Sequence, residues 1–240
     1  MKNLKYLFWL SFFSISTAAC LKLDPIPPKP VLKITEGPSV TDIEGNQYNT
    51  VVINTQTWTT SNLKVSKYRN GDTIPQVQDS IMWKSLISGA WCYYNNKATN
   101  DSIYGKLYNW YAINDTRGIA PEGYHIPSNA EWKEMTSYLG DQSLVGVKLK
   151  ATSGWGIGGI EGNGSNSGKF SGLPGGTRKE TAKFDYLLFY GYWWTSSSVD
   201  STNELGQDAW SRQLSYDDDI LSSWEDSKKR GFSLRCIKDK

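Results

Sequence analysis

The chain has 240 residues, with 26 lysines and arginines against 24 aspartates and glutamates, a length that suits one large domain or two small ones. Two of the lysines precede an apolar N-terminal run, so the rest of the chain has balanced charge and lacks the basic surface that nucleic-acid binding requires. The one histidine, His125, excludes metal sites built from several histidines, and its place in a proline-flanked turn predicts a structural role.

Residues 1–19 are typical of a secretory signal peptide. Two lysines precede an apolar run at 6–15, and the small residues 16–19 come directly before Cys20, which is the order of a cleavable signal. We expect lipid attachment at the Cys20 sulfur, so that the mature protein is held at a bacterial outer membrane, on its periplasmic or its cell-surface face. Ordinary cleavage and an uncleaved helix are the alternatives, although the apolar run is shorter than the roughly 20 residues of a spanning helix.

Residues 20–38 are expected to form a tether that follows the lipid anchor. The segment 24–30 is rich in proline, and such segments favour extended polyproline II, a semi-rigid spacer of about 3 Å per residue. We therefore expect a single globular domain over residues 39–240.

The first elements expected in this domain are a hairpin and a helix. Residues 41–48, followed by residues 51–53, predict a hairpin made of a strand, a Gly45-Asn46 turn and a second strand. Over 103–113 the apolar residues Leu107, Trp110 and Tyr111 share one helical face, which predicts one continuous helix.

A second helix has recognisable signals at both ends. Ser128 and Glu131 have the spacing of a capping box, and Gly140 follows the last apolar position. A third, short helix is expected over 144–150, followed by a glycine-rich stretch and by strands near 190–197, 209–214 and 231–237. Helices segregated from strands along the chain predict an α+β fold.

Aromatic residues and cysteines set the expectations for the interior. The chain has 11 tryptophans, 14 tyrosines and 7 phenylalanines, which suits a core made of large rings and also suits a surface that binds sugars. Apart from Cys20, the cysteines are Cys92 and Cys236. An exported chain favours one disulfide between them, and two buried free thiols are the alternative.

Five strings in order give the sequence a family resemblance. They are residues 104–112, 123–132, 173–178, 191–196 and 231–236. Together they resemble the Fibrobacter succinogenes major paralogous domain (FISUMP), a family of exported proteins and lipoproteins of Bacteroidetes, over about residues 40–238.

That family is similar in pattern to the sulfatase-modifying-factor branch of the C-type lectin-like fold. The resemblance implies an α+β domain with two main helices, small twisted antiparallel sheets and long loops. The formylglycine-generating relatives use a cysteine pair for oxygen-dependent chemistry. Cys92 and Cys236 are far apart in the sequence and the C-terminal pair is missing, so we expect no enzyme.

The expected function is that of a binding module on the cell envelope, with glycans as its ligands. The residues expected to contact a ligand are Trp193, Trp194, Trp210, Tyr216, Asp217, Asp218 and Asp219. Trp193 and Trp194 are neighbours in a predicted strand and point to opposite faces, so at least one should be core. The three aspartates could supply oxygens to calcium, and no other metal or cofactor is expected. A structural or adhesive protein that contacts other proteins is the alternative function.

Overall fold

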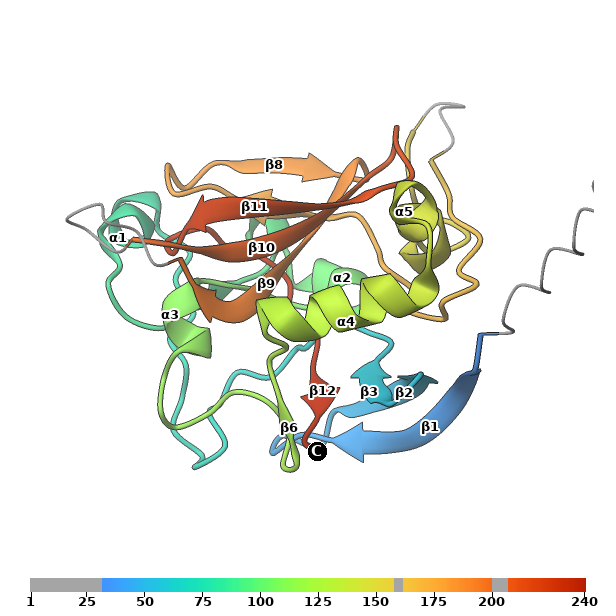
Figure 1. Ribbon diagram of the computed structural model, residues 1–240. Coiled ribbons are helices and arrows are strands. Elements are labelled where there is room, and N and C mark those ends of the chain that lie inside the picture. Colours follow the sequence, from blue (N-terminus) through green and yellow to red (C-terminus); the bar gives the residue numbers. More distant parts are fainter. Residues whose placement is uncertain (1–31, 158–161, 200–206) are drawn as a thin grey trace, which may run out of the picture. The chain divides into compact units, whose positions relative to one another are not determined.

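A computed structural model describes residues 32–157, 162–199 and 207–240 (Figure 1). This part of the chain is α+β, as predicted, with mostly strands in several sheets and a few short helices. None of its helices has the length and apolar character needed to cross a membrane. The predicted signal peptide, Cys20 and the tether as far as residue 31 lie outside the described residues.

The first sheet joins strands from both ends of the described chain. Its order is β1 (Ile34–Thr41), β2 (Gln47–Ile53), β3 (Gln56–Thr59), β12 (Ile237–Lys238) and β6 (Tyr124–His125), all antiparallel. A hairpin is present around the predicted Gly45-Asn46 turn, but its first strand, β1, ends at Thr41, where the predicted first strand begins. Residues 42–46 connect β1 to β2, and the Asp42 carboxylate accepts hydrogen bonds there from the backbone of Glu44 (2.9 Å) and Asn46 (3.0 Å). Ile34 already pairs with Ile53, so the tether boundary predicted at residue 38 is too late.

The second sheet carries the longest strand. Its order is β11 (Leu221–Ser227), β10 (Asp208–Ser215), β9 (Tyr190–Ser198), β7 (Gly175–Arg178) and β8 (Phe184–Leu187). The strands predicted near 190–197 and 209–214 are confirmed as β9 and β10. The strand predicted over 231–237 is wrong in extent, because residues 231–233 make only isolated bridges before β12. A separate pair, β4 (Trp91–Cys92) and β5 (Leu107–Tyr108), completes the sheets.

The helices are α1 (Ser80–Ser85), α2 (Asp101–Tyr104), α3 (Trp110–Ile113), α4 (Asn129–Leu139) and α5 (Val145–Leu149), with 3-10 turns at Tyr94–Asn96, Ala98–Asn100 and Gln142–Leu144. The capping box at Ser128 and Glu131 and the stop at Gly140 are confirmed in α4, and α5 matches the third predicted helix. The continuous helix predicted over 103–113 is wrong. Gly105 ends α2 with φ 71°, and Asn109 then caps α3 through its side chain.

The core is built from rings on both sides of β9. Helix α4 lies between the two sheets (Figure 1), and its Trp132 packs in one cluster with Trp58 of β3 and Trp193 of β9. The Trp58 and Trp132 ring centroids are 4.9 Å apart in an edge contact. Trp194, the next residue of β9, points to the other face and belongs to a second cluster that includes Phe232. Strand β9 therefore has core on both faces along this part of its length.

Arg235 connects three separate segments from inside the core. Its guanidinium donates to the carbonyls of Thr59 (2.8 Å), Phe170 (2.8 Å) and Ser171 (3.1 Å), and to Oδ1 of Asn62 (2.8 Å). No carboxylate in the described part of the chain pairs with it. Burial lowers the pKa of Arg235 to about 9, as expected for a cation held only by neutral groups.

Candidate functional site

One face of the second sheet is covered at one end and open at the other. Tyr190, Tyr192 and Trp194 alternate onto this face of β9, and Tyr192 lies opposite Gln213 of β10. At the covered end, Phe232 packs on Trp194 with ring centroids 4.5 Å apart. At the open end, the face forms a hollow.

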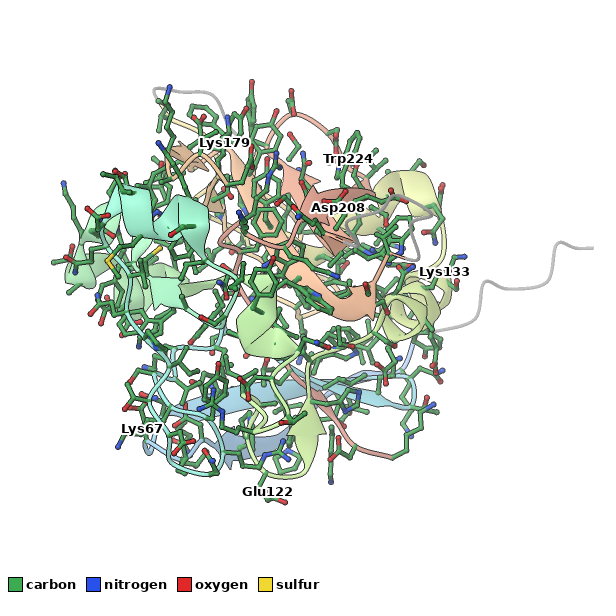
Figure 2. The ribbon with its side chains drawn as sticks, turned by 90° about the vertical axis from the view of Figure 1, so that its left-hand side faces the viewer. Lys67, Glu122, Lys133, Lys179, Asp208 and Trp224 are labelled. Atoms are coloured by element: carbon green, nitrogen blue, oxygen red, sulfur yellow. The ribbon has the colours of Figure 1, made fainter. Side chains whose placement is uncertain are left out.

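We call this the β9–β11 hollow; it has a volume of about 360 Å³. It is lined by Lys179, Tyr186, Tyr192, Gln213, Trp224, Glu225, Asp226 and Arg230. Lys179 and Trp224 lie near the same edge of the molecule, away from Lys67 and Glu122 (Figure 2). Strands β8, β9, β10 and β11, the turn between β7 and β8, and the turn after β11 therefore supply its wall.

Aromatic rings form the apolar part of the hollow. Trp224 is 53 % exposed and Tyr186 is 39 % exposed, so both rings offer surface to a ligand. Tyr192 lies deeper and stacks on Phe232 with an interplanar angle of 10° and a centroid distance of 4.9 Å. Tyr190 packs against Tyr186 at 5.0 Å, so the exposed Tyr186 ring rests on other aromatic rings.

One of the two acidic groups of the hollow, Asp226, is buried and held in place. Asp226 accepts a 2.6 Å hydrogen bond from the Ser211 hydroxyl and pairs with Arg230, which also pairs with Glu180 at 2.7 Å. Burial raises the pKa of Asp226, although the Ser211 hydrogen bond and the Arg230 charge oppose this shift. The carboxylate is thus positioned as a hydrogen-bond acceptor with little freedom to move.

The other polar groups differ in how far they are engaged. Lys179 Nζ lies 2.8 Å from the Asp185 carboxylate and 4.8 Å from the centre of the Tyr186 ring. Within the described residues, the side-chain amide of Gln213 has no hydrogen-bond partner. It is therefore available to donate to and accept from a ligand.

The backbone beside the exposed tyrosine is strained. Tyr186 has φ 67° and Leu188 has φ 69°, a left-handed conformation that costs a non-glycine residue of order 1–3 kcal/mol. The pairing of Thr177 with Asp185 holds β8 in place next to it. Strain of this kind is concentrated at binding and catalytic sites.

A second hollow of about 400 Å³ lies beside β1 and β2. Its lining residues include no aromatic side chain, and Lys169 pairs with Glu36 there at 3.4 Å. Because it offers hydrogen bonds and no ring on which a sugar could stack, it fits the expected chemistry less well than the β9–β11 hollow.

Two of the predicted ligand contacts are wrong. Trp193 and Trp194 are both fully buried, one in each core cluster. The expectation that at least one would be core was too weak, because β9 is covered on both faces at this point. Tyr216 is half-buried against Phe189, at 5.1 Å, and Tyr190, at 6.4 Å, so it supports the aromatic layer from behind.

The aspartate run forms an exposed turn that already holds a cation. Lys150 is buried, and its ammonium donates to the carbonyls of Ser215 (3.1 Å) and Asp218 (2.7 Å) and lies 3.5 Å from the Asp219 carboxylate. The Asp217 carboxylate accepts from the Ser215 hydroxyl. Three or more His, Cys, Asp or Glu side chains are nowhere grouped to hold a metal ion in the described ranges. Of the carboxylates predicted for calcium, that of Asp219 thus lies beside Lys150, that of Asp217 accepts from Ser215, and that of Asp218 accepts from the Ile220 amide.

Of the predicted contacts, Trp210 lines a hollow, but it is not the β9–β11 hollow. It points to the opposite face of the sheet, toward α4. The residues of the β9–β11 hollow were missed in the sequence because β8 and β11 were not expected as strands. The signal that could have found them is the alternation of Tyr190, Tyr192 and Trp194, which puts three rings on one face of β9. A further strand that pairs with β10 extends that same face.

The two remaining cysteines are free and buried. Cys92 and Cys236 lie in different core clusters, so the predicted disulfide is wrong and the alternative of two free thiols holds. Burial raises the pKa of the Cys92 thiol to about 12 and also raises the pKa of Cys236. Thiols in this state are poor nucleophiles.

His125 has the structural surroundings that were predicted for it. Its Nδ1 is 2.6 Å from the Asp239 carboxylate and its Nε2 is 3.0 Å from that of Glu131. It thereby connects β6 to the start of α4 and to the residue after β12.

Comparison with protein families assigns most of the chain to one of them. The family model of the Fibrobacter succinogenes major domain matches residues 51–238. No curated protein and no solved structure matches the chain.

Proposed function

The chain belongs to the Fibrobacter succinogenes major domain family, and we propose that it is a non-catalytic binding module of the cell envelope that takes glycans in the β9–β11 hollow. The observation that carries the proposal is the exposed Trp224 ring beside the unengaged amide of Gln213. A pyranose has an apolar face and a rim of hydroxyls, so it needs a ring on which to stack and polar groups around that ring.

The charges of the hollow favour a neutral sugar. Lys179 pairs with Asp185, and Arg230 pairs with both Glu180 and Asp226. Because these cations already have carboxylate partners, an anionic ligand would have to displace an existing ion pair. Sugar hydroxyls can instead accept from the cations and donate to Asp226 without breaking any of these three pairs.

A glycan array followed by titration calorimetry tests this proposal. We expect binding of one class of neutral saccharide, and we expect Trp224→Ala to weaken this binding roughly tenfold or more. An aromatic stacking contact contributes about 1 kcal/mol beyond the contribution of the apolar area that it buries. The matched control is Ile87→Ala, which removes another large apolar side chain that is 81 % exposed. Equal affinity of the two variants for the best array ligand would refute the site.

The state of the thiols supports binding rather than catalysis. Formylglycine-generating relatives need a reactive cysteine pair, and both core cysteines here are fully buried in separate clusters. Turnover of a chromogenic substrate panel by the wild-type chain would count against the proposal and would revive an enzymatic function.

One specific observation favours the alternative of a surface protein that contacts other proteins. Ile81 and Met82 of α1 are exposed, as is Ile87 just after this helix. Apolar side chains gathered in this way are typical of protein contacts. If arrays stay silent and wild-type protein captures one partner that Ile81→Asp does not, this alternative replaces glycan binding.

We also propose that the protein is an outer-membrane lipoprotein attached through Cys20. The proposal rests on the order of basic, apolar and small residues before Cys20. Mass spectrometry of the membrane fraction should find an acylated N-terminal cysteine, and Cys20→Ser should release the protein from membranes. An unmodified sulfur in membrane-extracted protein would contradict the anchor.

For the fold, we propose kinship with the C-type lectin-like domains of the sulfatase-modifying factors. What supports it is the shared order of a Pro-Ser-x-Ala-Glu-Trp helix start, a glycine-rich stretch and a Gly-Phe-x-x-Arg segment. In this chain these parts are the start of α4, the loop that ends near Gly172, and residues 231–235. An experimental structure of this chain that does not align with C-type lectin-like domains, including those of the sulfatase-modifying factors, would contradict this kinship.

A further inference from the structure

A separate hollow of about 370 Å³ lies on the opposite face of the second sheet, against α4. Asn129, Lys133 and Thr136 line it from α4, at the spacing that places residues on one side of a helix. Trp210 and Arg212 line it from β10, on the face that Gln213 does not share. We call it the α4–β10 hollow.

The charge of this hollow is one-sided. Arg212 and Lys133 line it, and no aspartate or glutamate does. Arg212 is only 5 % exposed, yet no described carboxylate forms an ion pair with it or with Lys133. Glu225 lies across from Trp210 on β11 but forms no such pair either.

The Arg212 guanidinium is fixed by neutral groups. Its Nη1 donates to the Ser211 carbonyl at 2.9 Å and the Ser223 hydroxyl at 2.8 Å, and its Nη2 donates to Asn129. Its Nε has no partner among the described residues. Burial lowers the pKa of Arg212 to about 10. A buried cation without a counter-ion is costly, and an anion in the hollow would relieve that cost.

We propose that the α4–β10 hollow is a second binding site, for a saccharide that carries an oxyanion, with the anion against Arg212 and Lys133 and the sugar ring on Trp210. Arginine is suited to this because its planar group matches a carboxylate or sulfate. The residues are different from those of the β9–β11 hollow, where every cation has its own carboxylate. We therefore expect a neutral ligand in the β9–β11 hollow and an anionic ligand in the α4–β10 hollow. The second site does not depend on the first.

Calorimetry on the full chain in detergent, at low salt, tests the proposal with four probes. They are tetragalacturonate, its methyl ester, a sulfated galactan tetrasaccharide and a neutral galactan tetrasaccharide. We expect the tetragalacturonate to bind and its methyl ester to bind roughly tenfold more weakly, because the ester removes the charge-assisted hydrogen bonds. Stronger binding of the sulfated probe would assign the oxyanion to a sulfate ester. Binding of all four probes with equal affinity, or of none, would overturn the site.

Variants locate the binding. We expect Arg212→Gln to weaken tetragalacturonate binding roughly tenfold and Lys133→Glu to weaken it about fivefold. Lys133 is exposed, so that variant tests the site even where an Arg212 variant fails to fold. The matched control is Lys67→Glu, the same charge change at an exposed position far from Lys133 (Figure 2).

One more variant separates the two proposals. Trp224→Ala should leave tetragalacturonate binding unchanged, whereas Trp210→Ala should weaken it. Loss of uronate binding in Trp224→Ala alone would move the ligand to the other hollow and overturn this inference. Wild-type affinity in Lys133→Glu and Trp210→Ala together would do the same.

Discussion

Arg235 offers the sharpest test of how this domain is held together. Its guanidinium makes four hydrogen bonds, to β3, to the loop before β7 and to Asn62, and it lies 4.3 Å from the centre of the Phe170 ring. Replacing it with methionine keeps a long apolar side chain and removes all four bonds. The acceptors left behind are the carbonyls of Thr59, Phe170 and Ser171, and the Asn62 amide oxygen, which keeps a 2.9 Å hydrogen bond from the Trp193 indole.

The size of the effect follows from two opposing contributions. Four hydrogen bonds at about 1 kcal/mol each, with a further cost for acceptors left unpaired, set the loss. Removing a buried cation with no described carboxylate partner offsets part of that loss. We expect Arg235→Met to lower the free energy of unfolding by about 3 kcal/mol. Arg235→Lys should lose less, because an ammonium keeps some of the hydrogen-bond donors although it cannot form the same fork.

Urea unfolding followed by tryptophan fluorescence measures this difference, provided that the transition is two-state. The matched control is Lys67→Met, which removes a cation from an exposed position and should stay within about 0.5 kcal/mol of wild type. If Arg235→Met has the same midpoint and slope as the wild type, the four bonds contribute nothing, and our description of the core junction is wrong.

Three further predictions concern thiols, acid and a helix stop. Without reductant, Cys92 and Cys236 should both react with a thiol reagent after unfolding and neither before it; a native disulfide would leave none to react. Asp115 has its pKa lowered to about 2 by hydrogen bonds from Arg117, so its stabilisation is present above the unfolded value near 4 and is lost as pH falls toward 2; Asp115→Asn should flatten the fall in stability over that window, and an unchanged slope would disprove the coupling. Gly105→Ala places a Cβ 2.8 Å from a backbone carbonyl at φ 71° and should cost about 1–3 kcal/mol in urea unfolding; wild-type stability would show that the stop at α2 is not set by glycine.

Local signals in the sequence predicted local structure well. The capping box at Ser128 and Glu131 gave α4 because both partners lie within one helical turn. The helix expected over 103–113 failed because its break depends on Gly105 approaching the Leu63 carbonyl, a contact between distant residues. An apolar face with helical spacing therefore fitted two short helices and a strand equally well.

The candidate site was harder to predict for the same reason. Whether a tryptophan on β9 is core or ligand contact depends on what covers each face of the sheet, and β9 has core on both. The aspartate turn could be taken for a calcium site because nothing near it in the sequence reveals Lys150, which approaches from α5. Trp224 could not be predicted as a ligand contact because its place in the hollow depends on the pairing of β11 with β10.

Strand β12 sits between β3 and β6, and it is the only link between them in the described sheet. The Cys236 amide, next to this strand, bonds the Thr59 hydroxyl across 177 residues of chain. Until this segment pairs, the edges of β3 and β6 that it covers are both open. A product that stops short of residue 236 would keep those edges open and be prone to aggregate or to be degraded. Protection of this sheet from aggregation therefore depends on the last few residues that pair within it.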